Sequence, residues 1–200
     1  MRDPLRRAER IFRDHGGTLR MAAAVAAGIN RRTLYAMRDE GVIEQLSRGV
    51  YRLKDMPELG TPDLVTVATR VPKGVICLIS ALAFHELTTQ IPHAVDLALT
   101  KGSEQPRIAY PPVNVYRFSG AAFTSGIERR KLDGHEVRIY DPEKSIADAF
   151  KYRNKLGIDV AVEALKTWRG RRRAPVERLL EQARVCRVER VIRPYLEAMT

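Results

Sequence analysis

Hydrophobic residues recur at helical spacing in three short stretches within the first 40 positions of the chain. These stretches predict helices over Pro4–His15, Leu19–Ala26 and Arg31–Arg38. Thr18 and Asn30 directly precede the second and third helices, and their side-chain oxygens suit the free N–H groups of a helix start. The pattern therefore predicts three consecutive helices, of which the last two are capped.

Glycines and a change of periodicity follow these helices. Gly28 falls in the tight turn between the second and third helices, and Gly41 ends the third. Two strand-like runs come next, Val42–Leu46 and Val50–Leu53, joined by residues 47–49 as a short hairpin. This order of elements predicts a winged helix-turn-helix in residues 1–55.

The third predicted helix has the side chains of a DNA-recognition helix. Leu34 and Met37 lie three residues apart and face inward, which leaves a basic and hydroxyl-bearing surface. Arginine recognises guanine edges and phosphates, and an arginine at a hairpin tip suits a minor groove or the backbone. The predicted DNA-binding residues are Arg31, Arg32, Thr33, Tyr35, Arg38 and Arg48. The alternative is an ordinary arginine-rich surface, with Tyr35 or Tyr51 completing a small core, and the ordered set of elements favours DNA.

The rest of the chain predicts a larger mixed α/β domain with C-terminal helices, so the fold class is α+β. Pro57, Gly60 and Pro62 mark a linker at about residues 56–62, and the second domain spans residues 63–200. The run Val75–Ile79 fits either a buried strand or the start of a buried helix. Strands are predicted at Val95–Thr100, Val113–Phe118 and Val137–Tyr140. Helices are predicted at Asp63–Arg70, from a Ser80 cap to Leu87, from an Asp141 cap, and over Ile158–Arg169, Pro175–Cys186 and Val188–Met199.

The net charge of +11 is concentrated at the two ends of the chain. Residues 1–55 carry +5 and residues 166–200 carry +6, whereas the middle is neutral. This distribution predicts salt-sensitive nucleic-acid binding by basic elements on a neutral body. Near the C-terminal end, a basic loop is either a solvated charge run or an additional contact for nucleic acid or a protein partner; its arginines are Arg169, Arg171, Arg172 and Arg173.

Cysteine use and hydropathy indicate a soluble cytoplasmic protein. Cys77 and Cys186 are too few and too far apart for a disulfide framework or a zinc site. The first residues contain no apolar signal core, and the apolar stretch near Val75–Phe84 is too short to span a bilayer. We therefore expect no export, no metal and no cofactor.

The search for catalytic motifs gives no catalytic residue. The chain contains no phosphate loop, Rossmann glycine fingerprint, paired-histidine metal motif or nucleophile elbow. Asp141, Glu143 and Lys144 loosely resemble a nuclease set, but a helix cap and first turn explain them better. His85 and His93 are lone histidines, for which structural roles are expected. The sequence predicts a protein that is not an enzyme.

Several segments in order resemble the AbiEi antitoxins of type IV toxin–antitoxin systems. They are residues Gly17–Leu53, Leu78–Thr88, Tyr140–Arg153 and Lys155–Leu165. The resemblance implies a bacterial antitoxin encoded beside a nucleotidyltransferase-like toxin, with antitoxin activity in the C-terminal domain and no direct complex required. It also implies that the N-terminal winged helix represses its own operon by binding inverted repeats in the operator DNA.

The resemblance further implies a monomer in solution that binds paired repeats cooperatively.

Two other classes of protein share part of these features. A winged-helix transcriptional regulator with no toxin partner would have the same N-terminal residues. A DNA-directed enzyme would need a divalent metal and would depend on Glu143.

Overall fold

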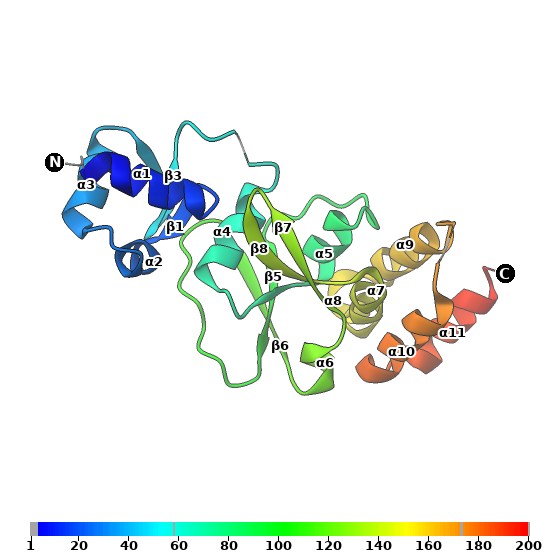
Figure 1. Ribbon diagram of the computed structural model, residues 1–200. Coiled ribbons are helices and arrows are strands. Elements are labelled where there is room, and N and C mark those ends of the chain that lie inside the picture. Colours follow the sequence, from blue (N-terminus) through cyan, green and yellow to red (C-terminus); the bar gives the residue numbers. More distant parts are fainter. Residues whose placement is uncertain (1–3, 58, 173, 200) are drawn as a thin grey trace. The chain divides into compact units, whose positions relative to one another are not determined.

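The computed structural model describes residues 4–57, 59–172 and 174–199 (Figure 1). The chain divides into two compact units. The first contains the chain up to Pro72 together with Pro106–Pro112 and Arg129–Val137, and the second contains Lys73–Gln105, Val113–Glu128 and the chain from Arg138 onward. Each unit has its own hydrophobic core, and each is described separately below.

The first unit begins with three helices and contains a small antiparallel sheet of order β1-β3-β2. Its elements are α1 (Pro4–Asp14), β1 (Thr18–Arg20), α2 (Met21–Ala26), α3 (Arg31–Asp39), β2 (Ile43–Ser47), β3 (Val50–Leu53) and α4 (Pro62–Arg70). Helical spacing brings apolar side chains of α1, α2 and α3 together with those of β2 and β3. The core residues include Phe12, Ala24, Leu34, Met37, Ile43, Tyr51 and Leu53.

The prediction that Thr18 caps the second helix is wrong. Thr18 lies in β1, directly opposite Arg52 of β3, and α2 starts only at Met21. Arg20 occupies the N-cap position and makes no side-chain capping bond. Pairing with β3 requires an extended backbone through Arg20, so sheet hydrogen bonds override the local capping preference of the threonine.

The second unit is built on a mixed sheet of order β6-β5-β4-β8-β7. Parts of the last two strands fall within Arg129–Val137, which belongs to the first unit. β4 pairs antiparallel with β5 and parallel with β8, and β5 pairs parallel with β6. The strands are β4 (Val75–Ile76), β5 (Val95–Thr100), β6 (Val113–Phe118), β7 (Ile127–Leu132) and β8 (His135–Tyr140). The helices are α5 (Leu78–Phe84), α6 (Ala121–Thr124), α7 (Pro142–Lys151), α8 (Arg153–Leu156), α9 (Ile158–Arg169), α10 (Val176–Cys186) and α11 (Glu189–Glu197).

The ambiguous run Val75–Ile79 contains both elements, because β4 ends at Ile76 and α5 begins at Leu78. The predicted Ser80 cap is wrong, since Cys77 holds the N-cap position and Ser80 lies inside α5. The Ser80 hydroxyl instead accepts a hydrogen bond of 2.9 Å from the backbone N–H of Asp96. This hydrogen bond therefore joins α5 to the start of β5.

Helix α7 starts as the sequence predicts. The Asp141 carboxylate accepts from the Lys144 backbone N–H at 2.7 Å, and Pro142 occupies the first turn. The helix contacts α5, α9, α10 and α11, so it is buried on nearly every side (Figure 1). Its buried residues are polar as well as apolar: Glu143, Lys144, Ser145, Ile146, Ala147, Asp148, Ala149 and Phe150.

The two fully buried charged groups among these residues, Lys144 and Asp148, form an ion pair. Lys144 Nζ donates to Asp148 Oδ2, and both side chains are fully buried. Lys144 Nζ also lies 4.1 Å from the ring centroid of Tyr140, and Cys186 Sγ donates to Asp148 Oδ1 at 3.2 Å. Burial raises the pKa of Asp148, and the neighbouring Lys144 opposes this rise. Gly126 has a φ of +70°, and a Cβ there would overlap the Lys144 side chain.

We expect Asp148→Asn to lower the free energy of unfolding by about 3–5 kcal/mol, because it leaves Lys144 charged and buried without a counter-ion. Replacing both Lys144 and Asp148 by methionine and leucine should recover most of the loss. Urea unfolding followed by circular dichroism measures both. The partly exposed pair Glu189–Arg193 has the same spacing, and Glu189→Gln should change little because water screens this pair. A loss for Asp148→Asn no greater than for Glu189→Gln would contradict this assignment.

Candidate nucleic-acid interface

The start of α3 is fixed by the cap that the sequence predicts. Asn30 Oδ1 accepts a hydrogen bond of 2.8 Å from the backbone N–H of Arg32. Gly28, with a φ of +93°, ends the turn after α2, and Ile29 is buried beneath it. Gly41 has a φ of +75° directly after the helix, where a glycine costs the least strain. The turn and the cap together orient α3.

The two faces of α3 differ in burial. Leu34 and Met37 are fully buried, as their spacing predicts. Of the residues predicted to bind DNA, four on α3 are exposed, and Thr33 is half-buried. The four are Arg31, Arg32, Tyr35 and Arg38. Helix α3 therefore presents guanidinium groups and a phenol on the side opposite its core contacts.

Arg38 differs from the other arginines of α3 because it already has partners. Its Nη2 lies 2.7 Å from Asp39 Oδ1, and its guanidinium carbon lies 5.2 Å from the ring centroid of Tyr35. The hydrogen bond to Asp39 and the charge of that carboxylate raise the pKa of Arg38. A phosphate or base that binds Arg38 therefore competes with Asp39.

The hairpin of β2 and β3 presents Arg48 in its turn. Arg48 is exposed, and a register shift between Gln45 and Ser47 interrupts the pairing just before the turn. Arg70, at the end of α4, donates from Nη1 to the Arg48 carbonyl and thereby holds the turn. Sequence reasoning missed Arg70, because no local pattern links a residue 22 positions away to the turn.

The C-terminal basic loop belongs to the second unit. Arg171 and Arg172 are exposed and Arg169 is half-buried, whereas Arg173 lies outside the described residues. Arg171 Nη2 donates to the carbonyl of His85, so this guanidinium also joins the loop to the end of α5.

The residues weighed for catalysis have structural partners. Asp141 caps α7, Glu143 accepts from Trp168 Nε1 at 2.8 Å, and Lys144 pairs with Asp148. His85 Nε2 lies 2.8 Å from the Tyr140 carbonyl oxygen.

His93 is exposed on the loop before β5. Within the part of the chain that the structure describes, no group of three or more His, Cys, Asp or Glu residues could hold a metal ion. No helix among these same residues has the length and apolar character needed to cross a membrane.

We expect Asn30→Ala to lower the free energy of unfolding of the first unit by about 1 kcal/mol, because the Arg32 N–H loses its acceptor. Asn30→Asp keeps an oxygen in place and should retain most of the stability. Hydrogen exchange of the α3 amides reports the change locally. Equal protection in Asn30→Ala and the unchanged protein would contradict the capping role.

Comparison with solved structures supports a shared fold across most of the chain. The crystal structure of the RV2827C protein from Mycobacterium tuberculosis matches with a TM-score of 0.53 and 16% sequence identity. The match covers 95% of this chain and 79% of that chain. Among curated proteins, none matches this sequence.

Comparison with protein families concerns the N-terminal residues. Residues 6–54 match the family described as "Transcriptional regulator, AbiEi antitoxin". The matched segment contains most of α1, the elements from β1 to β3 and all six residues predicted to bind DNA. The predicted resemblance to the AbiEi antitoxins is therefore confirmed, and the match that confirms it covers residues 6–54.

Proposed function

We propose that the first unit is a winged helix-turn-helix that binds operator DNA. Helix α3 enters the major groove, and the hairpin of β2 and β3 acts as the wing, with Arg48 against the backbone or minor groove. The observation that carries this proposal is the division of α3. Leu34 and Met37 are buried, while Arg31 and Arg32 are exposed on the turn that Asn30 caps.

The order of elements supports the same assignment. A helix, a strand, two helices joined by a glycine turn and a hairpin follow one another in residues 4–53, and β1 completes a three-stranded sheet with the hairpin. This sheet fixes the hairpin relative to α3 within the unit, since β2 contacts α3 directly. The segment also lies within the match to a family of transcriptional regulators.

At the level of the cell, we infer an antitoxin of a type IV system that represses its own operon. Its functional partner is a nucleotidyltransferase-like toxin, and the second unit carries the antitoxin activity. Exposed Arg171 and Arg172 offer that unit an additional contact for nucleic acid or a partner. The alternative is a winged-helix regulator with no toxin partner. Co-expression with the product of an adjacent nucleotidyltransferase gene separates the two, because only an antitoxin restores growth.

We expect Arg32→Ala to weaken specific DNA binding by about 1–3 kcal/mol, roughly 5- to 150-fold, because it removes a base contact. Arg48→Ala should weaken binding with a smaller change in sequence preference, since a backbone contact carries little sequence information. The measurement is a footprint on the DNA upstream of the protein's own gene, at moderate and high salt, beside unrelated DNA.

The outcomes of that footprint separate specific from general binding. Protection of paired repeats that survives competitor DNA supports an autoregulating repressor. Diffuse protection that salt abolishes would contradict the operator proposal and leave only general polyanion binding. Unchanged specific affinity in Arg32→Ala would contradict the assignment of α3 as the recognition helix.

We expect Asp39→Asn to strengthen DNA binding, because it frees Arg38 from its carboxylate partner. Glu40→Gln is the matched control: it removes the same charge from the next position, and the structure gives Glu40 no ion pair with Arg38. Both variants reduce the general repulsion of phosphates. The difference between their DNA affinities therefore measures the effect of freeing Arg38 from Asp39. Equal affinities for the two variants would exclude Arg38 from the interface.

A further inference from the structure

A segment from a distant part of the chain meets the turn of the β2–β3 hairpin within the first unit. Arg70, at the end of α4, donates from Nη1 to the Arg48 carbonyl, and its Nη2 donates to the Arg107 carbonyl at 2.8 Å. Arg107 lies 37 positions after Arg70, in the segment Pro106–Pro112 that belongs to this unit. One rigid guanidinium fork therefore ties the Pro106–Pro112 segment to the hairpin turn.

Arginine side chains gather around this turn. Arg48 and Arg107 are exposed, while Arg20 and Arg70 are half-buried. Arg20 ends β1 and lies directly opposite the first residue of β3, which places it beside the same turn. Burial lowers the pKa of Arg70, and the positive charges of Arg20 and Arg48 lower it further. Guanidinium groups keep their charge at neutral pH, so the fold concentrates positive charge at the turn.

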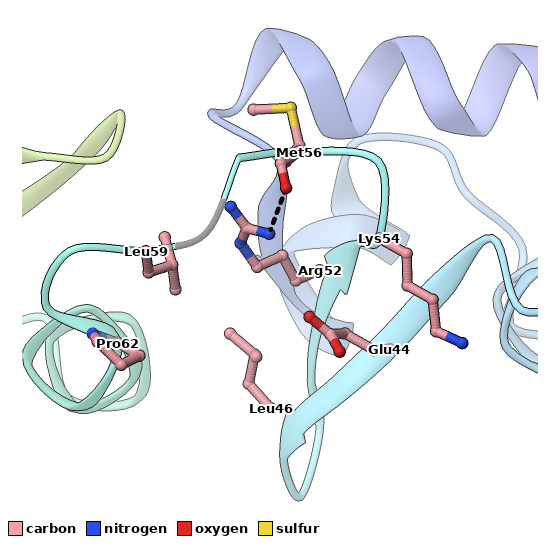
Figure 2. A pocket seen from close by; sticks show the side chains of 7 residues that line it. All are labelled: Glu44, Leu46, Arg52, Lys54, Met56, Leu59 and Pro62. Atoms are coloured by element: carbon pink, nitrogen blue, oxygen red, sulfur yellow. Dashed lines mark hydrogen bonds between the residues drawn. The ribbon is translucent and has the colours of Figure 1, made fainter.

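Two of the arginines in this region serve the structure itself. Both Nη atoms of Arg70 donate to carbonyls, so this residue positions the segments that it joins. Arg52 on β3 is only 5% exposed, and its Nη1 donates to the carbonyls of Leu53 and Met56, both at 3.3 Å (Figure 2). These bonds hold the chain as it leaves β3. Arg52 is therefore not a ligand-binding residue.

We propose that Arg20, Arg48 and Arg107 form one surface that binds the phosphate backbone of DNA, and that Arg70 holds this surface together. The proposal rests on the proposed function, since Arg48 is the wing residue assigned there to the backbone or minor groove. Several separate guanidinium groups suit a polyanion with regularly spaced phosphates. Because these groups are continuous with Arg48, duplex DNA is the polyanion that they meet.

Such contacts position the protein on DNA without reading its sequence. The wing then consists of more than a hairpin, because the Pro106–Pro112 segment extends it with Arg107. Arg70 is a positioning residue for both parts.

The experiment measures binding of the full chain to two duplexes of equal length, one from upstream of its own gene and one unrelated, over a range of salt concentrations. Arg107→Gln should weaken binding to both duplexes by about three- to tenfold and reduce the slope of log affinity against log salt by about 0.9, because one phosphate contact is lost. Arg190→Gln removes an exposed arginine of α11 and is the matched control, which should leave affinity and slope nearly unchanged.

Arg70→Lys tests the positioning role. This variant keeps the charge, but an ammonium is a point charge and cannot replace a fork that bridges two carbonyls. It should weaken binding by about fivefold, with circular dichroism as the check of folding. It should add little further loss when Arg48→Gln and Arg107→Gln are already present. If Arg70→Lys does not fold, Arg107→Gln decides the question.

Three results would overturn the proposal. Arg107→Gln could match Arg190→Gln in affinity and slope, which is also the result expected if RNA or an acidic protein is the ligand of this surface. The loss in Arg107→Gln could be confined to the upstream duplex, which would make Arg107 a base contact. The loss in Arg70→Lys could be equally large in the Arg48→Gln and Arg107→Gln background.

Arg32→Ala, measured on the same two duplexes, separates this proposal from the proposed function. A loss of upstream binding in Arg32→Ala without any effect of Arg107→Gln would remove the arginine surface and leave the recognition helix in place. Equal binding of both duplexes by the unchanged protein would contradict operator recognition, while Arg107→Gln would still test the arginine surface.

Discussion

The ion pair between Lys144 and Asp148 is the constraint on which the second unit depends. Both side chains lie fully buried on a helix that α5, α9, α10 and α11 surround. A charged pair in this position contributes little net stability, but either charge alone would be strongly destabilising. The ion pair therefore constrains how the helices pack, because the Asp148 carboxylate is fully hydrogen-bonded only when α10 places Cys186 against it.

The same helix shows how polar contacts select the position of α10. Arg178, Gln182 and Cys186 are spaced four residues apart on one face of α10. They bond respectively to Asp141, to Ser125 and to Asp148. Hydrophobic contacts tolerate a shift of a helix along its axis more readily than directional hydrogen bonds do. The apolar residues of α10 supply burial, and this polar row sets its register against α7 and against the end of α6.

Local patterns predicted much of the fold, and long-range pairing accounts for what they missed. Strand β5 and helix α9 have the predicted bounds, since each is a continuous apolar or periodic segment. Strand β7 was not predicted, because Ile127–Leu132 is mostly charged and lies at the edge of the sheet, where little apolar surface is required. The burial of Lys144 was also missed, because a lysine in the first turn of a helix ordinarily faces solvent.

The exposed face of α3 was more predictable than the core, because two buried residues, Leu34 and Met37, determine which side chains of the helix are exposed. Once Leu34 and Met37 face inward, helical geometry alone exposes Arg31, Arg32 and Tyr35. Helix α3 is also electrostatically unequal along its length, as its residue types already show. Its first turn carries two arginines at the positive end of the helix dipole, which attracts phosphate, while its end carries Asp39 and Glu40. We infer that the first turn of α3, rather than its end, approaches DNA most closely.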